Sequence, residues 1–193
     1  MTSFSATHPT LLNTLAPGNS LIRTARFAIA GSLLLALSAK AQVPFWPVPM
    51  TMQTFVVLVL GAVYGARLAG ATVALYLLEG ALGLPVFAGT PPAVAGLAYM
   101  AGPTGGFLVG FLAAAVLVGY LAERGWDRTF LRLSAVMVLG HAVIFAFGLA
   151  WLSALMPFVK AWAAGFVPFM AATALKTALA IAAMQAAWTV VKR

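Results

Sequence analysis

Residues 21–49 read LIRTARFAIAGSLLLALSAKAQVPFWPVP, an apolar run of helical length followed by a segment rich in proline. A helix of roughly 20 apolar residues crosses the hydrocarbon core of a bilayer, and the run from Leu21 to Ala39 has about that length. Pro44, Pro47 and Pro49 then exclude a helix, because each removes a backbone donor and restricts the chain to an extended path. The stretch predicts a membrane span that leads into an irregular loop.

The composition of the whole chain excludes the soluble classes of protein. Of the 193 residues, 63% are hydrophobic and 7% are charged, whereas a soluble domain has about 45–50% apolar and about 25% charged residues. Three acidic and eleven basic residues cannot cover the surface of a globular protein of this size in water. A soluble enzyme, a disordered chain and a coiled coil are excluded, and an integral membrane protein is predicted.

Five further apolar runs have the length of a full or a short span. They are residues 52–64, 68–82, 103–121, 133–155 and 166–191. None shows the alternation of a barrel strand, so helices are the predicted spanning structure. The predicted fold is therefore an all-α integral membrane protein with six transmembrane helices in residues 21–193. The polar residues 1–20 are predicted to be a disordered tail.

The basic residues predict the orientation in the membrane. The formal net charge is +8, and the charges lie singly or in pairs at the ends of apolar runs, not in a stripe that would bind nucleic acid. Basic residues mark the cytoplasmic loops of membrane proteins. One side of the predicted topology carries Arg23, Arg26, Arg67, Arg124, Arg128, Arg132, Lys192 and Arg193, and the other carries Lys40 and Lys160. Both termini are therefore predicted to be cytoplasmic, and the loops 43–49 and 83–102 to face outward.

Two charges fall inside predicted spans. They are Glu79, near the outer end of the third span, and Lys176, about ten residues into the sixth. A charge at such depth costs at least about 2.5–3.5 kcal/mol on insertion scales, so each is a candidate functional residue. Two interpretations stay open: the two charges pair with each other, or they line a polar cavity beneath the outer loops.

The outer loop 83–102 supports the cavity interpretation. It is too apolar for a solvated loop and too rich in Gly and Pro for a helix. Irregular backbone at membrane depth occurs only where it is buried in protein or lines a cavity. We expect a lid, with Trp46, Phe87 and Tyr99 as apolar walls and backbone groups as polar contacts. For each aromatic taken alone, a residue of the membrane interface is the favoured interpretation.

Few residues in the chain could perform chemistry. Cysteine is absent, which excludes disulfides and thiolate metal sites. No phosphate-binding, zinc-protease or nucleophile-elbow motif occurs, so neither an enzyme nor a cofactor or metal is predicted. His141 has no second ligand at metal-binding spacing and is predicted to be a hydrogen-bonded core residue. Energy for active transport would come from a partner or from an ion gradient.

Small residues recur in the first span at Ala28, Ser32 and Ala36. Such a row allows another helix to approach closely within the membrane. The neighbour is either a helix of this chain or a partner protein, and the sequence alone favours neither.

Three motifs in register extend this interpretation. Residues 47–54 read PVPMTMQT, residues 80–89 read GALGLPVFAG, and residues 102–107 read GPTGGF. In these motifs the chain resembles the BioY family, the biotin-specific substrate-binding (S) components of energy-coupling factor transporters. The resemblance covers nearly the whole chain from about Arg23 onward, with the motifs in order and correctly separated.

The resemblance implies six helices in a bacterial inner membrane, biotin held on the outer side under the first and third outer loops, and no intrinsic ATPase. It also implies a partner, a transmembrane coupling protein with two cytoplasmic ATPases that topples the S component to deliver the vitamin inward. Some family members lack dedicated partners. The row Ala28, Ser32 and Ala36 is similar to the alanine-rich contact of the family's first helix with the coupling protein.

The sixth helix departs from the family pattern Pro-Phe-x-x-Gly-Asp-x-x-Lys, whose Asp and Lys contact the ureido ring. Residues 168–176 read PFMAATALK, so Lys176 is retained and Thr173 replaces the aspartate. The predicted ligand-binding residues are Lys176, Thr173, Glu79, Trp46, Phe87, Gly89, Gly96 and Tyr99. Alternatives are an S component for another vitamin or a biotin precursor, and a structural subunit without a ligand; the buried charges argue against the latter.

Overall fold

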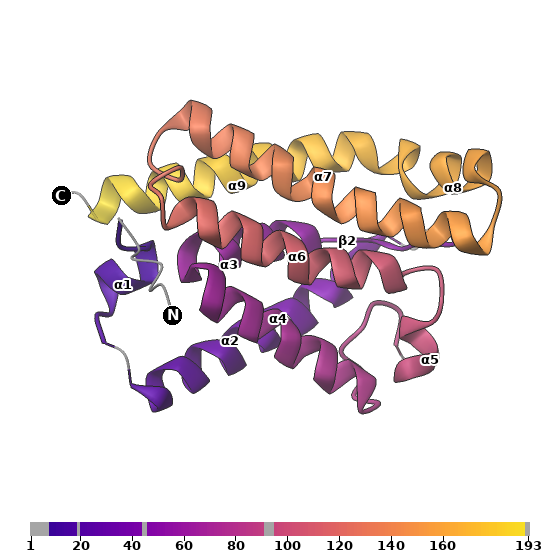
Figure 1. Cartoon of the computed structure of the whole chain (residues 1–193), viewed down its shortest axis with the longest axis horizontal. Helices are drawn as coiled ribbons and strands as arrows, with labels where there is room; N and C mark the ends of the chain where they lie inside the picture. The colour runs from indigo at the N-terminus through magenta and orange to yellow at the C-terminus, as the bar shows by residue number, and fades with distance from the viewer. Residues whose placement is uncertain (1–7, 19, 44–45, 91–94, 192–193) are drawn as a thin grey trace, which may run out of the picture.

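The computed structural model describes residues 8–18, 20–43, 46–90 and 95–191, and the chain is mostly helical (Figure 1). Six long helices lie within a few residues of the predicted spans. They are α2 (Leu21–Lys40), α3 (Gln53–Tyr64), α4 (Ala66–Ala81), α6 (Gly105–Ala122), α7 (Phe130–Leu155) and α9 (Met170–Val191). The shorter elements are α1 (Leu11–Leu15), α5 (Leu97–Met100), α8 (Phe158–Gly165) and the 3₁₀ turn η1 (Val167–Phe169).

Four helical segments of the described chain are long and apolar enough to cross a membrane. They are α2, α6, α7 and the continuous stretch Phe158–Val191 that comprises α8, η1 and α9. Helices α3 and α4 have 12 and 16 residues, which is below the roughly 17–25 residues of a typical spanning helix. Four of the six predicted spans are therefore matched by helices of sufficient length. That α3 and α4 also cross the membrane stays a prediction.

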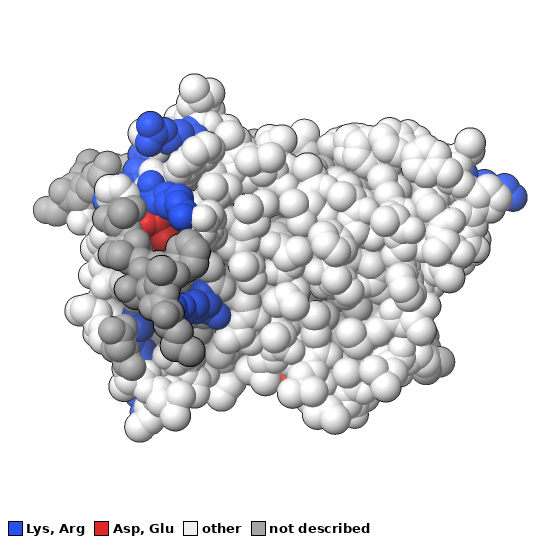
Figure 2. All heavy atoms as spheres, viewed as in Figure 1, with Lys and Arg blue, Asp and Glu red and all other residues white. Residues whose placement is uncertain are grey.

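Helix α6 lies at the centre of the bundle, where it packs against α3, α4 and α7. Helix α2 packs on α4, and α9 packs on α7 and α3. Helix α1 and the end of α9 lie at one end of the molecule, and α5 and α8 lie at the opposite end (Figure 1). Lys and Arg side chains gather at the α1 end, as Figure 2 shows for one face.

Close helix contacts in the core depend on glycine. A Cβ atom at Gly106 of α6 would lie 2.3 Å from the Cβ of Trp151 and 2.5 Å from the carbonyl oxygen of Phe147, both on α7. Small residues let membrane helices approach in this way. The GPTGGF motif is thereby explained in part by the packing of α6 on α7.

The proline-rich loop forms a short hairpin. Strand β1 (Gln42–Val43) pairs antiparallel with β2 (Met50–Thr51), with Gln42 opposite Thr51 and Val43 opposite Met50. The described residues 42–43 and 50–51 are extended and residues 46–48 form bends, so the described part of the loop is not helical, as the prolines predict. Pro44 and Phe45, to which the sequence interpretation also referred, lie outside the described residues.

The structure differs from the expectation of a disordered tail. Residues Leu11–Leu15 form α1, and Leu11 and Leu12 are buried where α1 packs against α3 and α9. The Arg128 side chain donates to the carbonyl oxygen of Pro9 at 2.8 Å, and Arg23 donates to Asn13 at 3.2 Å. Local composition did not reveal this order, because its source is packing against distant helices.

Helix α8 was not predicted. The stretch before the sixth span folds into eight helical residues that pack against α7. Ala161 and Gly165 are buried, whereas Phe158, Val159 and Trp162 are exposed. Helix α8 therefore exposes apolar side chains to solvent or lipid. From the sequence alone, this stretch could not be distinguished from an outer loop.

We predict that Gly106→Ala destabilises the bundle by about 1–3 kcal/mol, because the methyl group meets backbone and Cβ atoms that cannot rotate away. Gly70→Ala is the matched control, since its Cβ would meet only the Val116 side chain at 3.0 Å. Thermal unfolding in detergent should show a lowered Tm for Gly106→Ala and an unchanged or raised Tm for Gly70→Ala. Equal losses would contradict the packing explanation.

Candidate functional site

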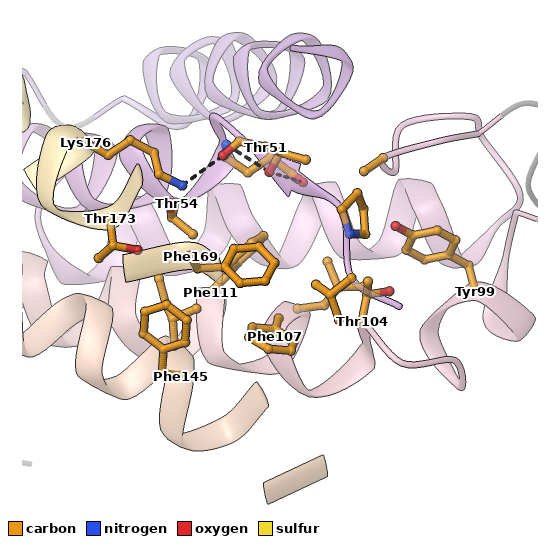
Figure 3. Close-up of a pocket in the computed structure, with 16 residues that line it drawn as sticks. Thr51, Thr54, Tyr99, Thr104, Phe107, Phe111, Phe145, Phe169, Thr173 and Lys176 are labelled. Carbon is orange, nitrogen blue, oxygen red and sulfur yellow. Dashed lines mark hydrogen bonds between the residues drawn. The ribbon is translucent and has the colours of Figure 1, made fainter. Parts of the chain in front are cut away.

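A partly open cavity lies within the bundle between α3, α6, α7 and α9 (Figure 3). Its walls are mostly apolar and include polar groups at both ends. The lining residues are Val48, Pro49, Thr51, Gln53, Thr54, Ala88, Tyr99, Thr104, Phe107, Leu108, Phe111, Ile144, Phe145, Phe169, Thr173 and Lys176.

Lys176 and Thr173 form one polar end of the cavity (Figure 3). The two residues are three apart on α9, which places them on one face of the helix. Lys176 is 6% exposed, and its Nζ donates to the carbonyl oxygen of Thr51 at 3.0 Å. An ammonium has three donors, and the described residues accept from one of them. Lys176 can therefore donate to a polar atom of a ligand.

Thr54 supplies a second unused polar group. Its hydroxyl is buried and has no hydrogen-bond partner among the described residues, and it lines the cavity. A buried polar group without a partner costs roughly 1–3 kcal/mol. A ligand with a donor or acceptor at this position would remove that cost.

Four phenylalanines form the apolar wall. Phe107 and Phe111 lie one turn apart on α6, Phe145 comes from α7, and Phe169 comes from η1. The ring of Phe145 meets those of Phe107 and Phe169 edge to face, with centroids 6.4 and 6.5 Å apart. This wall suits an apolar ring or chain, since aromatic side chains contribute large contact area.

The segment of residues 82–90, here called the lid segment, closes the end of the cavity opposite Lys176. Phe87 is fully buried, stacks on Tyr99 at 4.8 Å between centroids, and meets Tyr76 edge to face at 5.5 Å. A Cβ at Gly80 would lie 2.0 Å from the Phe87 ring. Only glycine at position 80 leaves room for this ring, which explains the spacing of the GALGLPVF motif.

Hydrogen bonds join the lid segment to the cavity wall. Gln53, which lines the cavity, donates from Nε2 to the Tyr76 hydroxyl at 2.7 Å. That hydroxyl donates to the carbonyl oxygen of Val86 at 3.1 Å. Tyr99 lines the cavity beneath Phe87, and burial raises the pKa of its phenol, partly offset by a hydrogen bond with Thr104. Tyr99 is therefore a neutral hydrogen-bonding group at neutral pH.

A sequence model of the BioY family matches residues 9–193. The chain belongs to the BioY family. Biotin transporter BioY of Rhizobium etli is 40% identical over 140 residues, which are 69% of this chain and 73% of the relative. Biotin transporter BioY of Thermotoga maritima is 39% identical over 115 residues, which are 60% of this chain and 65% of the relative.

The fold is similar to a crystal structure of the S-component for biotin from an ECF-type ABC transporter. The TM-score is 0.74 over 87% of this chain and 93% of that chain, with 20% sequence identity. At this identity the likeness shows that the two chains share a fold. The BioY motifs of residues 47–54, 80–89 and 102–107 each contribute to the cavity or to the lid segment of that fold.

The structure brings together three of the residues expected to bind a ligand. Lys176, Thr173 and Tyr99 line the cavity, and Phe87 supports Tyr99 from behind. Gly89 and Gly96 have φ of +72° and +81°, so they shape the loop around the cavity without lining it. Trp46 is 83% exposed and does not line the cavity, because the hairpin turn carries it to the surface.

Neither interpretation of the two buried charges holds for Glu79. It does not line the cavity with Lys176, and it does not pair with Lys176. Its carboxylate accepts a hydrogen bond from the Ser32 hydroxyl of α2, while the Lys176 ammonium bonds to Thr51. Glu79 projects from α4 toward α2, and so it joins those two helices.

The small-residue row of α2 packs inside the chain. Ala28 is 9% exposed and Ser32 is fully buried, and Ala36 is partly buried against the core. Helix α2 packs on α4 along this side. The row is therefore not a free surface for a partner, and its small side chains allow the approach of α4.

Sequence reasoning missed most of the cavity wall. Gln53 and Thr54 lie within the motif of residues 47–54, and Phe107 ends the motif of residues 102–107. Their place in these motifs could have marked them as candidate site residues. Phe145 and Phe169 belong to apolar runs and carry no such signal. In a chain with 13 phenylalanines, composition does not separate a cavity wall from a lipid contact.

We predict that Tyr76→Phe loosens the lid segment. The change leaves the Gln53 amide and the Val86 carbonyl without their partner, at a cost of about 1–3 kcal/mol. Tyr64→Phe is the control, because the Tyr64 hydroxyl makes one bond, to the Phe27 carbonyl, at a partly buried site. Thermal unfolding should show a larger loss for Tyr76→Phe, and an equal or smaller one would contradict the linking function of Tyr76.

Proposed function

We propose that this protein is the biotin-binding S component of an energy-coupling factor transporter, which captures biotin at the outer face of a bacterial inner membrane and delivers it inward. Membership of the BioY family supports the proposal, as do relatives that are named biotin transporters. The observation that carries it is the cavity with Lys176 and Thr173 at one end and the lid segment at the other.

The chemistry of biotin suits this cavity. Its ureido group has one carbonyl acceptor and two N–H donors, next to an apolar thioether ring and an aliphatic chain. Lys176 supplies a charged donor for the carbonyl, and the hydroxyls of Thr173 and Thr54 supply acceptors for N–H groups. The phenylalanine wall surrounds the apolar ring and chain. Hydrogen bonds to an ionised donor are about twice as strong as neutral ones.

Thr173 indicates which alternative substrates the cavity could bind. A threonine hydroxyl both donates and accepts, whereas the aspartate of the family pattern would only accept. A vitamin or biotin precursor that offers an acceptor here would bind equally well to Thr173. A subunit without a ligand is a weaker proposal, because the buried Lys176 lines the cavity together with Thr54, whose hydroxyl has no hydrogen-bond partner in the described part of the chain.

The proposed topology has six spans with both termini in the cytoplasm. Helices α3 and α4 would complete the count as short spans within the bundle. Lys and Arg side chains gather at the α1 end of the molecule (Figure 2), which supports a cytoplasmic position for that end. The hairpin, the lid segment and α8 would then face outward.

The proposed partner is a transmembrane coupling protein with two ATPase subunits. The described chain offers no nucleotide-binding motif, so uptake against a gradient needs an external source of energy. The surface of Ala28, Ser32 and Ala36 is not proposed as the contact, because these side chains are buried or partly buried inside the chain. The exposed apolar face of α2 is available to a partner or to lipid; it includes Ile29, Leu33 and Leu37.

We predict that Lys176→Met weakens biotin binding by about 1.5–3 kcal/mol, the usual effect of losing a hydrogen bond to a charged group. Thr173→Asp restores the acceptor of the family pattern with a full charge, and should bind biotin at least as tightly as the natural protein. Equilibrium binding of labelled biotin to each purified variant measures both effects.

Lys160→Met is the matched control for the lysine change, because Lys160 is exposed on α8 and should bind biotin normally. Thermal unfolding of each variant separates lost binding from lost fold. If Lys176→Met and Thr173→Asp both leave the dissociation constant unchanged, the ligand does not lie against this face of α9.

The topology is testable because the natural chain contains no cysteine. In intact cells an impermeant maleimide should label Trp46→Cys, which lies on the exposed hairpin turn. Thr129→Cys, exposed in the link before α7, should be labelled only after the membrane is permeabilised. The reverse pattern would contradict the proposed orientation.

A further inference from the structure

Lys40, the last residue of α2, holds the lid segment by three backbone carbonyls. Its Nζ donates to the carbonyl oxygens of Pro85 at 2.6 Å, Phe87 at 3.0 Å and Thr90. A lysine ammonium has three N–H donors, and each of these finds one carbonyl of the lid segment. The sequence marked Lys40 only as an outward-facing charge.

The three carbonyls belong to the residues that shape the top of the cavity. Phe87 stacks on Tyr99, which lines the cavity, and Ala88 lines it directly. Thr90 is 2% exposed, and its hydroxyl also donates to the Phe87 carbonyl, at 2.8 Å. A displacement of this short stretch would therefore move both Tyr99 and Ala88.

Lys40 reaches the lid segment from a different helix. The chain enters the lid segment from α4 and leaves it toward α5, whereas Lys40 comes from the end of α2. Helix α2 is fixed to α4 by packing and by the bond from Ser32 to Glu79. The Lys40 ammonium is thus held on a helix that is fixed in place. Its charge-assisted hydrogen bonds restrict the motion of the lid segment, whose glycines would otherwise allow it to move.

We propose that Lys40 is a positioning residue that keeps the lid segment closed over the occupied cavity and so sets how long the substrate stays bound. This rests on the proposed function. Lys40 does not line the cavity, so it acts on the substrate through Phe87, Ala88 and Tyr99. Loosening a lid speeds dissociation more than it slows association, because most affinity changes within one complex appear in the off-rate.

The competing explanation is that Lys40 binds the substrate's carboxylate directly. Its three donors already bond to carbonyl oxygens in the closed structure, which leaves none for an anion. Direct binding would make the effect of a Lys40 change depend on the charge of the ligand. Positioning of the lid segment would make the effect the same for a charged and an uncharged ligand.

The test compares Lys40→Met, Lys40→Arg and the exposed control Lys160→Met in stopped-flow binding of biotin and of biotin methyl ester. For both ligands, Lys40→Met should raise the dissociation rate about tenfold and change the association rate less. Lys40→Arg keeps the charge and several donors and should dissociate more slowly than Lys40→Met. Lys160→Met should match the natural protein.

An unchanged dissociation rate in Lys40→Met would overturn the proposal, and an effect on biotin but not on its methyl ester would replace it with direct carboxylate binding. Amide hydrogen exchange without ligand separates this test from the proposed function. Residues 84–90 should exchange faster in Lys40→Met than in the natural protein, while α7 is unaffected. Unchanged exchange of residues 84–90 would overturn the proposal even if biotin proves not to be the ligand.

Discussion

The buried ammonium group of Lys176 is the constraint on which the rest of the site depends. A charge inside apolar helices costs several kcal/mol unless polar groups surround it. The carbonyl oxygen of Thr51 supplies one such group at 3.0 Å, and Thr51 is placed there by the hairpin of β1 and β2. The hairpin that follows α2 thus has a structural consequence, because it brings an accepting carbonyl to α9.

The opposite end of the cavity is closed by apolar packing and by hydrogen bonds from two helices. Phe87 occupies the space left by Gly80 and stacks on Tyr99. Tyr76 of α4 and Lys40 of α2 hold the backbone of the lid segment. The cavity therefore has a rigid charged end and an end formed by a loop, an arrangement that allows a small molecule to enter and then be enclosed.

The long helices were predictable because the length of an apolar run can be compared with the thickness of the bilayer core. The shared face of Thr173 and Lys176 was predictable because residues three apart on a helix are neighbours. The partner of Glu79 was not, since Ser32 lies 47 residues away and the contact exists only after α2 packs on α4. Helix α1 was missed for the same reason, because the burial of Leu11 and Leu12 depends on α3 and α9.

Isothermal titration calorimetry of the purified natural protein with biotin tests whether the cavity is a biotin site. We expect saturable one-to-one binding at two temperatures, with a negative heat-capacity change, because the apolar ring and chain of biotin leave water for the phenylalanine wall. Absence of saturable binding at both temperatures, from a protein that unfolds cooperatively on heating, would show that the cavity does not bind biotin.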